Sequence, residues 1–223
     1  MAPYNQIVPP TPRLADEESF AEWVALHKTA LGWAALAVVI AIGGGWFYER
    51  SESLKAERAE KAYYQARQEA AVGNAKLAMS DFKKLTERYP KTRAGVQGRI
   101  YMAQMHLDQK KFKEGIAELK SADNAVGSDD DFSASIHMLE ANAYEELKDF
   151  VNAADQYRLA AETSKFPNDK NRYRAYQARA LVGAGKRAEA LAIWQDLAKD
   201  PASPFALEAK LRIGELEASP AKV

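Results

Sequence analysis

The sequence predicts an all-α protein in which a single N-terminal transmembrane helix precedes an α-solenoid of about four helical hairpins and a C-terminal capping helix. The first observation is a run of 20 residues between Lys28 and Glu49 that carries no charge. The second is a set of small residues that recur every 37 or 38 residues through the rest of the chain. The third is composition, because 12 Gly and 9 Pro in 223 residues are too few for a β protein rich in turns.

Charge and cysteine content exclude several classes of protein. The chain has no cysteine, so disulfide scaffolds, thiol catalysis and Cys-based zinc sites are excluded. Lys and Arg together number 31, as do Asp and Glu, so the formal net charge is zero. Binding to nucleic acid through overall charge is not expected, because counterion release needs an excess of Lys and Arg.

The uncharged run, residues 29–48, is predicted to span a membrane. A helix needs about 20 apolar residues to cross a hydrocarbon core of about 30 Å. Trp33 lies near one end of the run and an aromatic triplet, residues 46–48, lies at the other, where such rings prefer the membrane interface. A buried core helix would usually be shorter, and a cleaved signal peptide would have a shorter apolar region closer to Met1. An uncleaved anchor in the lipid bilayer is the better interpretation.

Small residues that lie three or four positions apart fall on one face of the predicted span. They are Ala30, Ala34, Ala37, Ala41 and Gly45. Such a face lets another transmembrane helix approach closely, so it is a candidate site for helix packing against a protein partner in a membrane complex. The alternative is that Ala and Gly are simply common in such helices.

The residues before the span are expected to form two segments. Residues 1–15 contain four prolines, so we expect an arm without regular helix. Residues 16–28 begin with acidic residues, which suit the start of a helix, and continue with Phe20, Trp23 and Val24 at helical spacing. This pattern predicts an amphipathic helix at the membrane surface that runs into the span.

After the span, each predicted hairpin carries small residues on both helices and a bulky residue one turn later. The small residues of the first helices are Ala66, Ala103, Ala141 and Ala178. The small residues of the second helices are Ala78, Gly115, Ala153 and Ala190, and the bulky residues that follow are Phe82, Leu119, Tyr157 and Trp194. The predicted helices are 51–72, 75–88, 92–109, 112–125, 132–147, 150–163, 169–183, 187–199 and a capping helix at 204–218. Each hairpin leaves an apolar face that only its neighbour can cover, so the hairpins must stack.

This pattern resembles the tetratricopeptide repeat (TPR), whose second helix carries a small residue, an aromatic residue four positions later and a proline eight positions after that. Ala78, Phe82 and Pro90 match all three positions, whereas Gly115 and Leu119 are the poorest match. The period is longer than the usual length of about 34 residues. The resemblance implies a degenerate TPR-like repeat domain over residues 51–218, followed by a tail at 219–223.

A stack of hairpins forms a curved groove lined by the first helices. Amide side chains can bind a peptide backbone there, and arginines can bind carboxylates. The candidate groove residues are Tyr63, Arg67, Gln104, Asn142, Arg172, Arg174 and Arg179. The alternative is an ordinary solvated face. Tyr64, Tyr101 and Tyr176 are expected to be packing residues.

No pattern in the chain predicts catalysis, so we expect neither an enzyme nor a cofactor, a metal or a small-molecule substrate. The phosphate-binding loop, HExxH and GxSxG motifs are absent from the sequence. His27, His106 and His137 are expected to be structural or surface histidines. Asp129, Asp130 and Asp131 lack the ligand spacing of a calcium loop. A hydrolase with an unrecognised site is the weakest of the remaining alternatives.

Over residues 16–217 the arrangement resembles the ancillary subunit family of the Sec translocon. The resemblance rests on the acidic stretch DEESFAEWVALHK, the Gly- and Ala-rich span that ends in Trp-Phe-Tyr, and the degenerate repeats that follow. It implies a non-catalytic single-pass protein of the bacterial inner membrane, with its repeats in the periplasm and with protein partners. The charges disagree, because more Lys and Arg follow the span than precede it, which favours repeats in the cytoplasm. The alternative function is a structural subunit of another large membrane complex, respiratory or photosynthetic.

Overall fold

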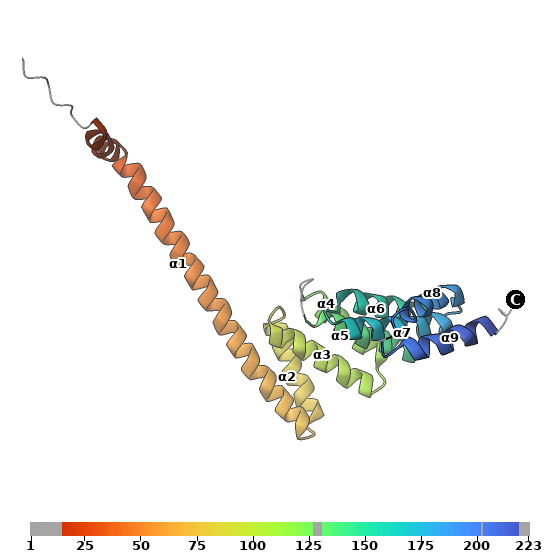
Figure 1. Cartoon of the computed structure of the whole chain (residues 1–223). Helices are drawn as coiled ribbons and strands as arrows, with labels where there is room; N and C mark the ends of the chain where they lie inside the picture. Colours follow the sequence, from red (N-terminus) through yellow and green to blue (C-terminus); the bar gives the residue numbers. More distant parts are fainter. Residues whose placement is uncertain (1–14, 127–130, 202, 219–223) are drawn as a thin grey trace, which may run out of the picture. The chain divides into compact units, whose positions relative to one another are not determined.

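A computed structural model describes residues 15–126, 131–201 and 203–218, and every element in those ranges is an α-helix (Figure 1). The prediction of an all-α fold is therefore confirmed. The helices are α1 (Ala15–Ala71), α2 (Ala75–Arg88), α3 (Arg93–Asp108), α4 (Phe112–Asp123), α5 (Ser133–Glu146), α6 (Phe150–Thr163), α7 (Pro167–Gly183), α8 (Arg187–Leu197) and α9 (Ala206–Ala218). Most of the predicted arm and the whole tail, residues 1–14 and 219–223, lie outside the described residues.

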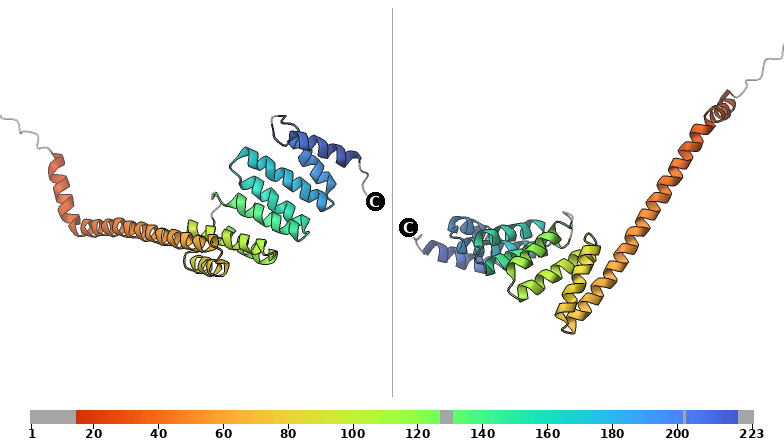
Figure 2. Two further views of the ribbon diagram at one scale, coloured as in Figure 1. Left: turned by 90° about the horizontal axis from the view of Figure 1, so that it is seen from below. Right: turned by 180° about the vertical axis from the view of Figure 1, so that it is seen from behind.

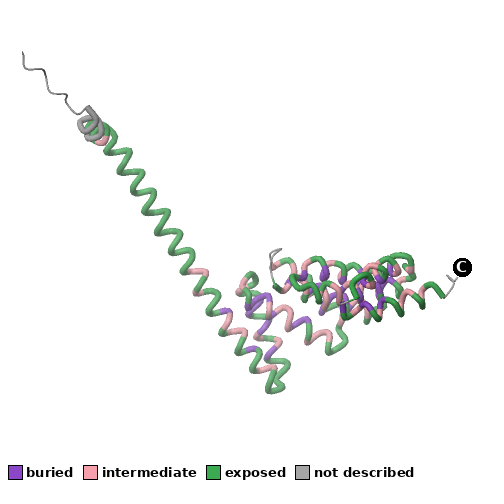
Figure 3. Tube along the Cα trace, in the orientation of Figure 1, coloured by how far each residue is buried: buried purple, intermediate pink, exposed green. Residues whose placement is uncertain are grey.

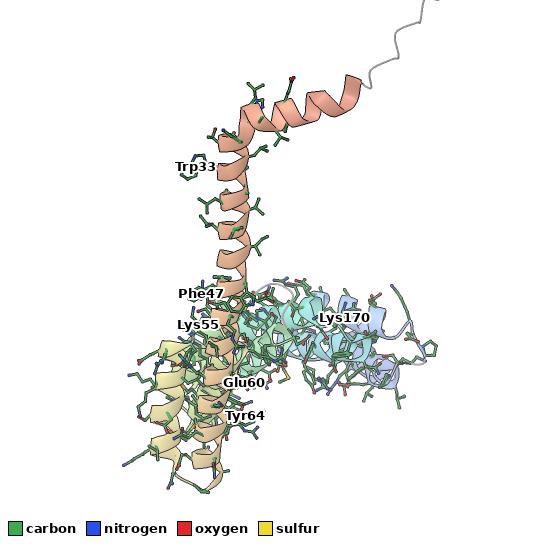
Figure 4. The ribbon with its side chains drawn as sticks, turned by 90° about the vertical axis from the view of Figure 1, so that its left-hand side faces the viewer. Trp33, Phe47, Lys55, Glu60, Tyr64 and Lys170 are labelled. Carbon is green, nitrogen blue, oxygen red and sulfur yellow. The ribbon has the colours of Figure 1, made fainter. Side chains whose placement is uncertain are left out.

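The chain divides into two compact units, Met1–Ser53 and Leu54–Val223. In the first unit, every residue of the predicted span 29–48 is exposed. The stretch is long and apolar enough to cross a membrane, by length and composition. The part of α1 that precedes Trp33 bends away from the direction of the part that carries it (Figure 4). The three consecutive glycines 43–45 do not interrupt the helix, so the segments predicted separately as 16–28, 29–48 and 51–72 form one helix.

In the second unit, the small residues of the predicted repeat lie where successive helices touch. Ala66, Ala103, Ala141 and Ala178 are each 0% exposed, as are Ala78, Ala153 and Ala190 on the second helices. Buried positions accordingly concentrate along the inner sides of the helices (Figure 3). The helices α5 to α8 lie side by side as successive layers (Figure 2). Small side chains permit this close approach. The positions that repeat in the sequence are therefore the positions at which the helices of the domain pack together.

The bulky residues of the first three hairpins pack with the first helix of the next hairpin. The ring of Phe82 stacks on Tyr101 with centroids 4.7 Å apart, and Tyr157 meets Tyr176 edge-on at 5.4 Å. Leu119 lies in one apolar cluster with Leu139, which occupies the equivalent position of the third hairpin. Each hairpin therefore packs against its neighbours, as expected for a solenoid.

The turns inside the four hairpins repeat one backbone conformation. Gly73, Lys110, Lys148 and Gly185 have positive φ values of 86°, 60°, 61° and 78°, and they are separated by the same 37 or 38 residues as the packing positions. Glycine adopts this conformation without steric cost, whereas lysine is disfavoured in it. The turn between the two helices therefore repeats with the same period as the buried packing positions.

Gly95→Ala is expected to lower the free energy of unfolding by about 1–3 kcal/mol, because an added Cβ would collide with the backbone carbonyl oxygen of Tyr89. Gly95 lies in the first turn of α3, where its N–H donates to the capping Thr92 side chain. The matched control is Gly214→Ala on α9, where an added Cβ would meet nothing within 4 Å. This control should raise stability by about 0.5–1 kcal/mol, the usual effect of removing a helical glycine. Urea unfolding followed by circular dichroism measures both, and equal signs would contradict the prediction.

Candidate functional site

Four of the predicted groove residues form one row along the first helices of the hairpins, hereafter the groove row. They are Arg67 on α1, Gln104 on α3, Asn142 on α5 and Arg179 on α7, and all four are exposed. Each directly follows a fully buried alanine, so its side chain points about 100° away from the packing face. The repeat therefore places two arginines and two amides at equivalent exposed positions of four successive helices.

At the first hairpin, the groove row rests on aromatic rings. The guanidinium of Arg67 lies 6.0 Å from the ring centroid of Tyr63, and Tyr63 in turn lies 5.9 Å from Phe82. Burial raises the pKa of Tyr63, and the positive charge of Arg67 opposes that rise. The prediction that Tyr64 is a packing residue is wrong, because its side chain is 63% exposed (Figure 4). Tyr64 is the next residue after Tyr63, so its side chain points about 100° around the helix, away from the packing face.

At the third and fourth hairpins, the groove row joins a chain of polar contacts across several helices. The hydroxyl of Tyr157 on α6 lies 2.7 Å from Asn142 Oδ1 and 3.0 Å from a Glu145 oxygen on α5. Burial, with added repulsion from Glu145, raises the pKa of this phenol. Tyr157 touches Tyr176, whose ring lies 5.2 Å below the guanidinium of Arg179.

Arg179 is already paired with a carboxylate of the same chain. Its Nη2 lies 2.6 and 2.7 Å from the two oxygens of Glu208 on α9, and its Nε donates to the nearer oxygen at 3.0 Å. Within the described residues, Arg67 has no ion pair of this kind. At the first hairpin, a ligand carboxylate would therefore meet an arginine that has no carboxylate partner among the described residues. At the fourth hairpin, it would have to displace Glu208.

The structure separates Arg174 from the other predicted groove residues. Arg174 lies about 140° around α7 from Arg179, and it pairs with Asp196 on α8. This ion pair lowers the pKa of Asp196. Arg172 shares a face with Arg179, but it pairs with Asp169 at 3.1 Å and stacks over Tyr173. Arg172 therefore stays on the face of the groove row, paired like Arg179 with an acidic residue of the same chain.

Sequence reasoning did not identify Glu145 and Glu208 as parts of this surface. Glu145 carries a local signal, because it lies three residues after Asn142 and so on the same helical face. Glu208 carries no such signal. It lies 29 residues after Arg179, and the two side chains meet only because the folded chain brings α9 close to α7.

Side chains with catalytic potential are scattered rather than gathered. No group of three His, Asp or Glu side chains that could hold a metal occurs among the described residues. His27 Nδ1 contacts the Trp23 carbonyl oxygen at 2.8 Å, and His137 Nδ1 contacts Gln156 at 2.9 Å. Asp131 pairs with Lys165, which lowers the pKa of its carboxyl, whereas Asp129 and Asp130 lie outside the described residues.

One acidic residue lies in the packed interior of the repeat domain. Glu140 on α5 is 2% exposed, and burial raises its pKa to about 7. The positive charge of Lys120 opposes the shift, and the negative charge of Asp123 adds to it. The folded state therefore keeps this proton up to about pH 7, whereas the unfolded chain releases it near pH 4.5.

Glu140→Gln is expected to abolish a fall in stability between pH 4.5 and about 7. In this window the folded state binds more protons than the unfolded state, so the free energy of unfolding of the unaltered chain falls as pH rises. The total fall is up to about 3 kcal/mol, and the variant should be more stable by that amount at pH 8. Urea unfolding at a series of pH values measures it. Glu146→Gln, an exposed change on the same helix, is the control, and an unchanged pH profile in Glu140→Gln would refute the prediction.

Comparison with known proteins identifies the repeat. The model of the tetratricopeptide repeat-like domain family matches residues 21–139, which is more than half of the chain. The chain belongs to this family. In TPR-like proteins the repeats are typically non-catalytic scaffolds for protein interaction. No curated protein matches the chain.

Solved TPR-like structures share this fold at low sequence identity. A kinesin light chain of Podosopora anserina with nearly identical TPR-like repeats superposes with a TM-score of 0.54 at 14% identity, over 72% of this chain and 86% of that one. YrrB, a TPR protein with an unusual peptide-binding site, superposes with a TM-score of 0.53 at 16% identity, over 70% of this chain and 75% of its own. At these identities the likeness concerns the fold alone.

Proposed function

We propose that this TPR-like protein is a non-catalytic scaffold that is anchored in a membrane by residues 29–48 and binds protein partners through its repeat domain. One observation carries the proposal: 20 consecutive uncharged residues, all of them exposed, precede the repeats on the same chain. Exposure of so many apolar side chains to water is unfavourable, whereas the hydrocarbon of a bilayer would cover them. The family match begins at residue 21, so it takes in this segment together with the first repeats.

The groove row is the proposed contact surface for a peptide segment of the partner. The amides of Gln104 and Asn142 can exchange hydrogen bonds with a peptide backbone, and Arg67 can pair with a carboxylate. The peptide-binding site of YrrB, a protein of the same fold, supports this use of the repeats.

The proposed setting is the bacterial inner membrane, where the protein would be an accessory subunit most like the ancillary subunit of the Sec translocon. The order of acidic stretch, Gly- and Ala-rich span and degenerate repeats supports this setting. The small face at Ala30, Ala34, Ala37, Ala41 and Gly45 is the proposed contact with a partner's transmembrane helix. The repeats would then lie in the periplasm. A structural subunit of a respiratory or photosynthetic complex would use the same surfaces.

Purification in mild detergent, followed by mass spectrometry of co-purifying proteins, tests the proposal. Translocon subunits and periplasmic chaperones are the expected partners, whereas stoichiometric electron-transfer or pigment proteins would favour the alternative. The groove variant Arg67→Ala/Gln104→Ala should lose soluble partners but keep those held by the span. Its matched control is Arg158→Ala/Gln195→Ala, which removes the same residue types from exposed positions on second helices. Equal losses in both variants would rule out the groove row as the contact surface.

The side of the membrane can be determined because the chain contains no cysteine. Ser80→Cys, at an exposed position of α2, introduces a single reactive thiol into the repeat domain. A maleimide that cannot cross membranes should label this thiol in intact spheroplasts if the repeats are periplasmic. Labelling only after lysis would place them in the cytoplasm, as the distribution of Lys and Arg favours.

A further inference from the structure

The first hairpin of the repeat domain carries a basic groove between α1 and α2, with a volume of about 470 Å³. Four cationic side chains line it, Arg58 and Lys61 from α1 and Lys84 and Arg88 from α2, against a single acidic residue, Asp81. The volume lies within the usual range of ligand sites, which is about 300–1,000 Å³. The lining thus has an excess of three positive charges in a space that could hold a small anionic group.

Two of the four cations are not neutralised by neighbours. Lys84 pairs with Asp81 at 2.9 Å, and Lys61 pairs with Glu57 at 2.7 Å. Within the described residues, Arg58 makes no ion pair, and the guanidinium of Arg88 lies over the Tyr89 ring at 5.5 Å from its centroid. Both guanidinium groups are exposed, and each presents donors that match a phosphate or a carboxylate.

The second and third hairpins lack this charge at the equivalent positions. One repeat later, the residues equivalent to the four cations are Gly95, Gly98, Ser121 and Ala125, and two repeats later they are Ser133, Ile136, Leu159 and Thr163. Gly95, Gly98, Ser133 and Ile136 are buried. In the second hairpin this face packs on the preceding one, since a Cβ on Gly98 would lie 3.0 Å from Leu85.

The first-helix positions that the second and third hairpins bury are therefore exposed on the first hairpin, where they carry cations. A terminal repeat needs a polar outer face for solubility, but residues of either charge would satisfy that need. The excess of positive charge requires another explanation. On α1 itself, Lys55, Arg58 and Lys61 lie within an arc of about 120°, and Glu57 and Glu60 fall outside it.

The short chain segment between the proposed anchor and the basic groove indicates which anion lies nearest to the groove. Arg58 follows Tyr48, the last residue of the span, by ten residues. Even a fully extended chain would keep it within about 36 Å of that residue. Lipid headgroups at the same face of the bilayer are thus at high effective concentration, which no soluble acidic partner has. Clusters of Lys and Arg next to the cytoplasmic end of a span are known sites for anionic lipids, and the same attraction acts on anionic headgroups in either leaflet.

We infer that the basic groove of the first hairpin binds the phosphate headgroup of an anionic phospholipid and so holds this hairpin at the membrane surface. The inference rests on the membrane anchor of the proposed function. Arg58 and Arg88 bind the phosphate oxygens, and Lys61 and Lys84 add positive charge at the rim of the groove.

Energy transfer in nanodiscs tests the inference with the full chain. A donor fluorophore is attached to Ser80→Cys, beside the groove on α2, and a lipid with an acceptor on its headgroup is added as tracer. Transfer should be greater in phosphatidylcholine discs that also contain phosphatidylglycerol than in discs of phosphatidylcholine alone. Arg58→Gln/Arg88→Gln should lose this increase, whereas Lys113→Gln/Lys210→Gln, which removes two exposed charges elsewhere, should keep it. Added salt should weaken the increase.

Each other outcome identifies what has failed. A chain that does not co-migrate with the discs would overturn the membrane anchor. A chain within discs that shows no response to phosphatidylglycerol, or whose response survives Arg58→Gln/Arg88→Gln, would overturn the lipid site alone. Equal losses in both double variants would attribute the effect to net charge. Binding of a fluorescent polyglutamate peptide that depends on Arg58 and Arg88, without a lipid response, would assign the groove to acidic proteins. Circular dichroism of each variant checks that it folds.

Discussion

Trp194→Ala is expected to lower the free energy of unfolding by about 3–5 kcal/mol, the usual cost of truncating a buried aromatic residue. Trp194 is 0% exposed and lies in the cluster that joins α5 to α9, with Tyr157, Leu181, Leu197 and Ala209 among its members. Its loss would leave a cavity among α7, α8 and α9, and packed helices relax only partly to fill such a space. Urea unfolding of the full chain in detergent, followed by circular dichroism, measures the change.

Two further variants give this prediction its controls. The indole N–H of Trp194 is buried without a hydrogen-bond partner among the described residues, so Trp194→Phe removes an unsatisfied donor and keeps most of the ring. It should cost clearly less than the alanine variant. Leu207→Ala on α9 removes a side chain that is 82% exposed and should change stability by less than about 0.5 kcal/mol. If Trp194→Ala cost no more than Leu207→Ala, the described core would be wrong.

Val38→Arg/Ile42→Arg is expected to move the chain from the membrane fraction to the soluble fraction. Each arginine at the centre of a span opposes insertion by about 2.5–3.5 kcal/mol, so the pair costs about 5–7 kcal/mol. Val38 and Ile42 are 56% and 68% exposed and lie one helical turn apart, so the change alters the proposed lipid-facing surface rather than internal packing. Carbonate extraction of membranes, with detection of the chain in pellet and supernatant, measures the result.

The control for this experiment keeps the segment apolar. Val38→Leu/Ile42→Leu should leave the chain in the carbonate-resistant pellet. The intact mass of the mature protein separates an anchor from a cleaved leader, because cleavage would remove the residues up to the end of the span. A resistant pellet for the arginine variant would show that residues 29–48 are not what holds the chain in the membrane.

The helices of the repeat domain could be predicted closely because their signals are local and recur four times. Predicted helices such as 75–88 and 150–163 match α2 and α6 at both ends. The buried alanines could also be predicted, since a small residue at a fixed repeat position serves only close packing. The prediction that Tyr64 is a packing residue fails because a matching repeat position does not ensure burial at the first hairpin, whereas the equivalent residues Tyr101 and Tyr176 are partly buried.

Hydropathy and periodicity are properties of short stretches of chain, so the sequence alone was enough to identify the apolar segment, the number of hairpins and the exposed row at Arg67, Gln104, Asn142 and Arg179. Contacts between residues far apart in the chain depend on how helices and loops fold back on one another. Three such contacts are the ion pair between Arg179 and Glu208, the ion pair between Arg174 and Asp196, and the groove that Arg58 and Arg88 line together. They became visible only in three dimensions, because no spacing along the chain encodes which charges the packed helices bring together.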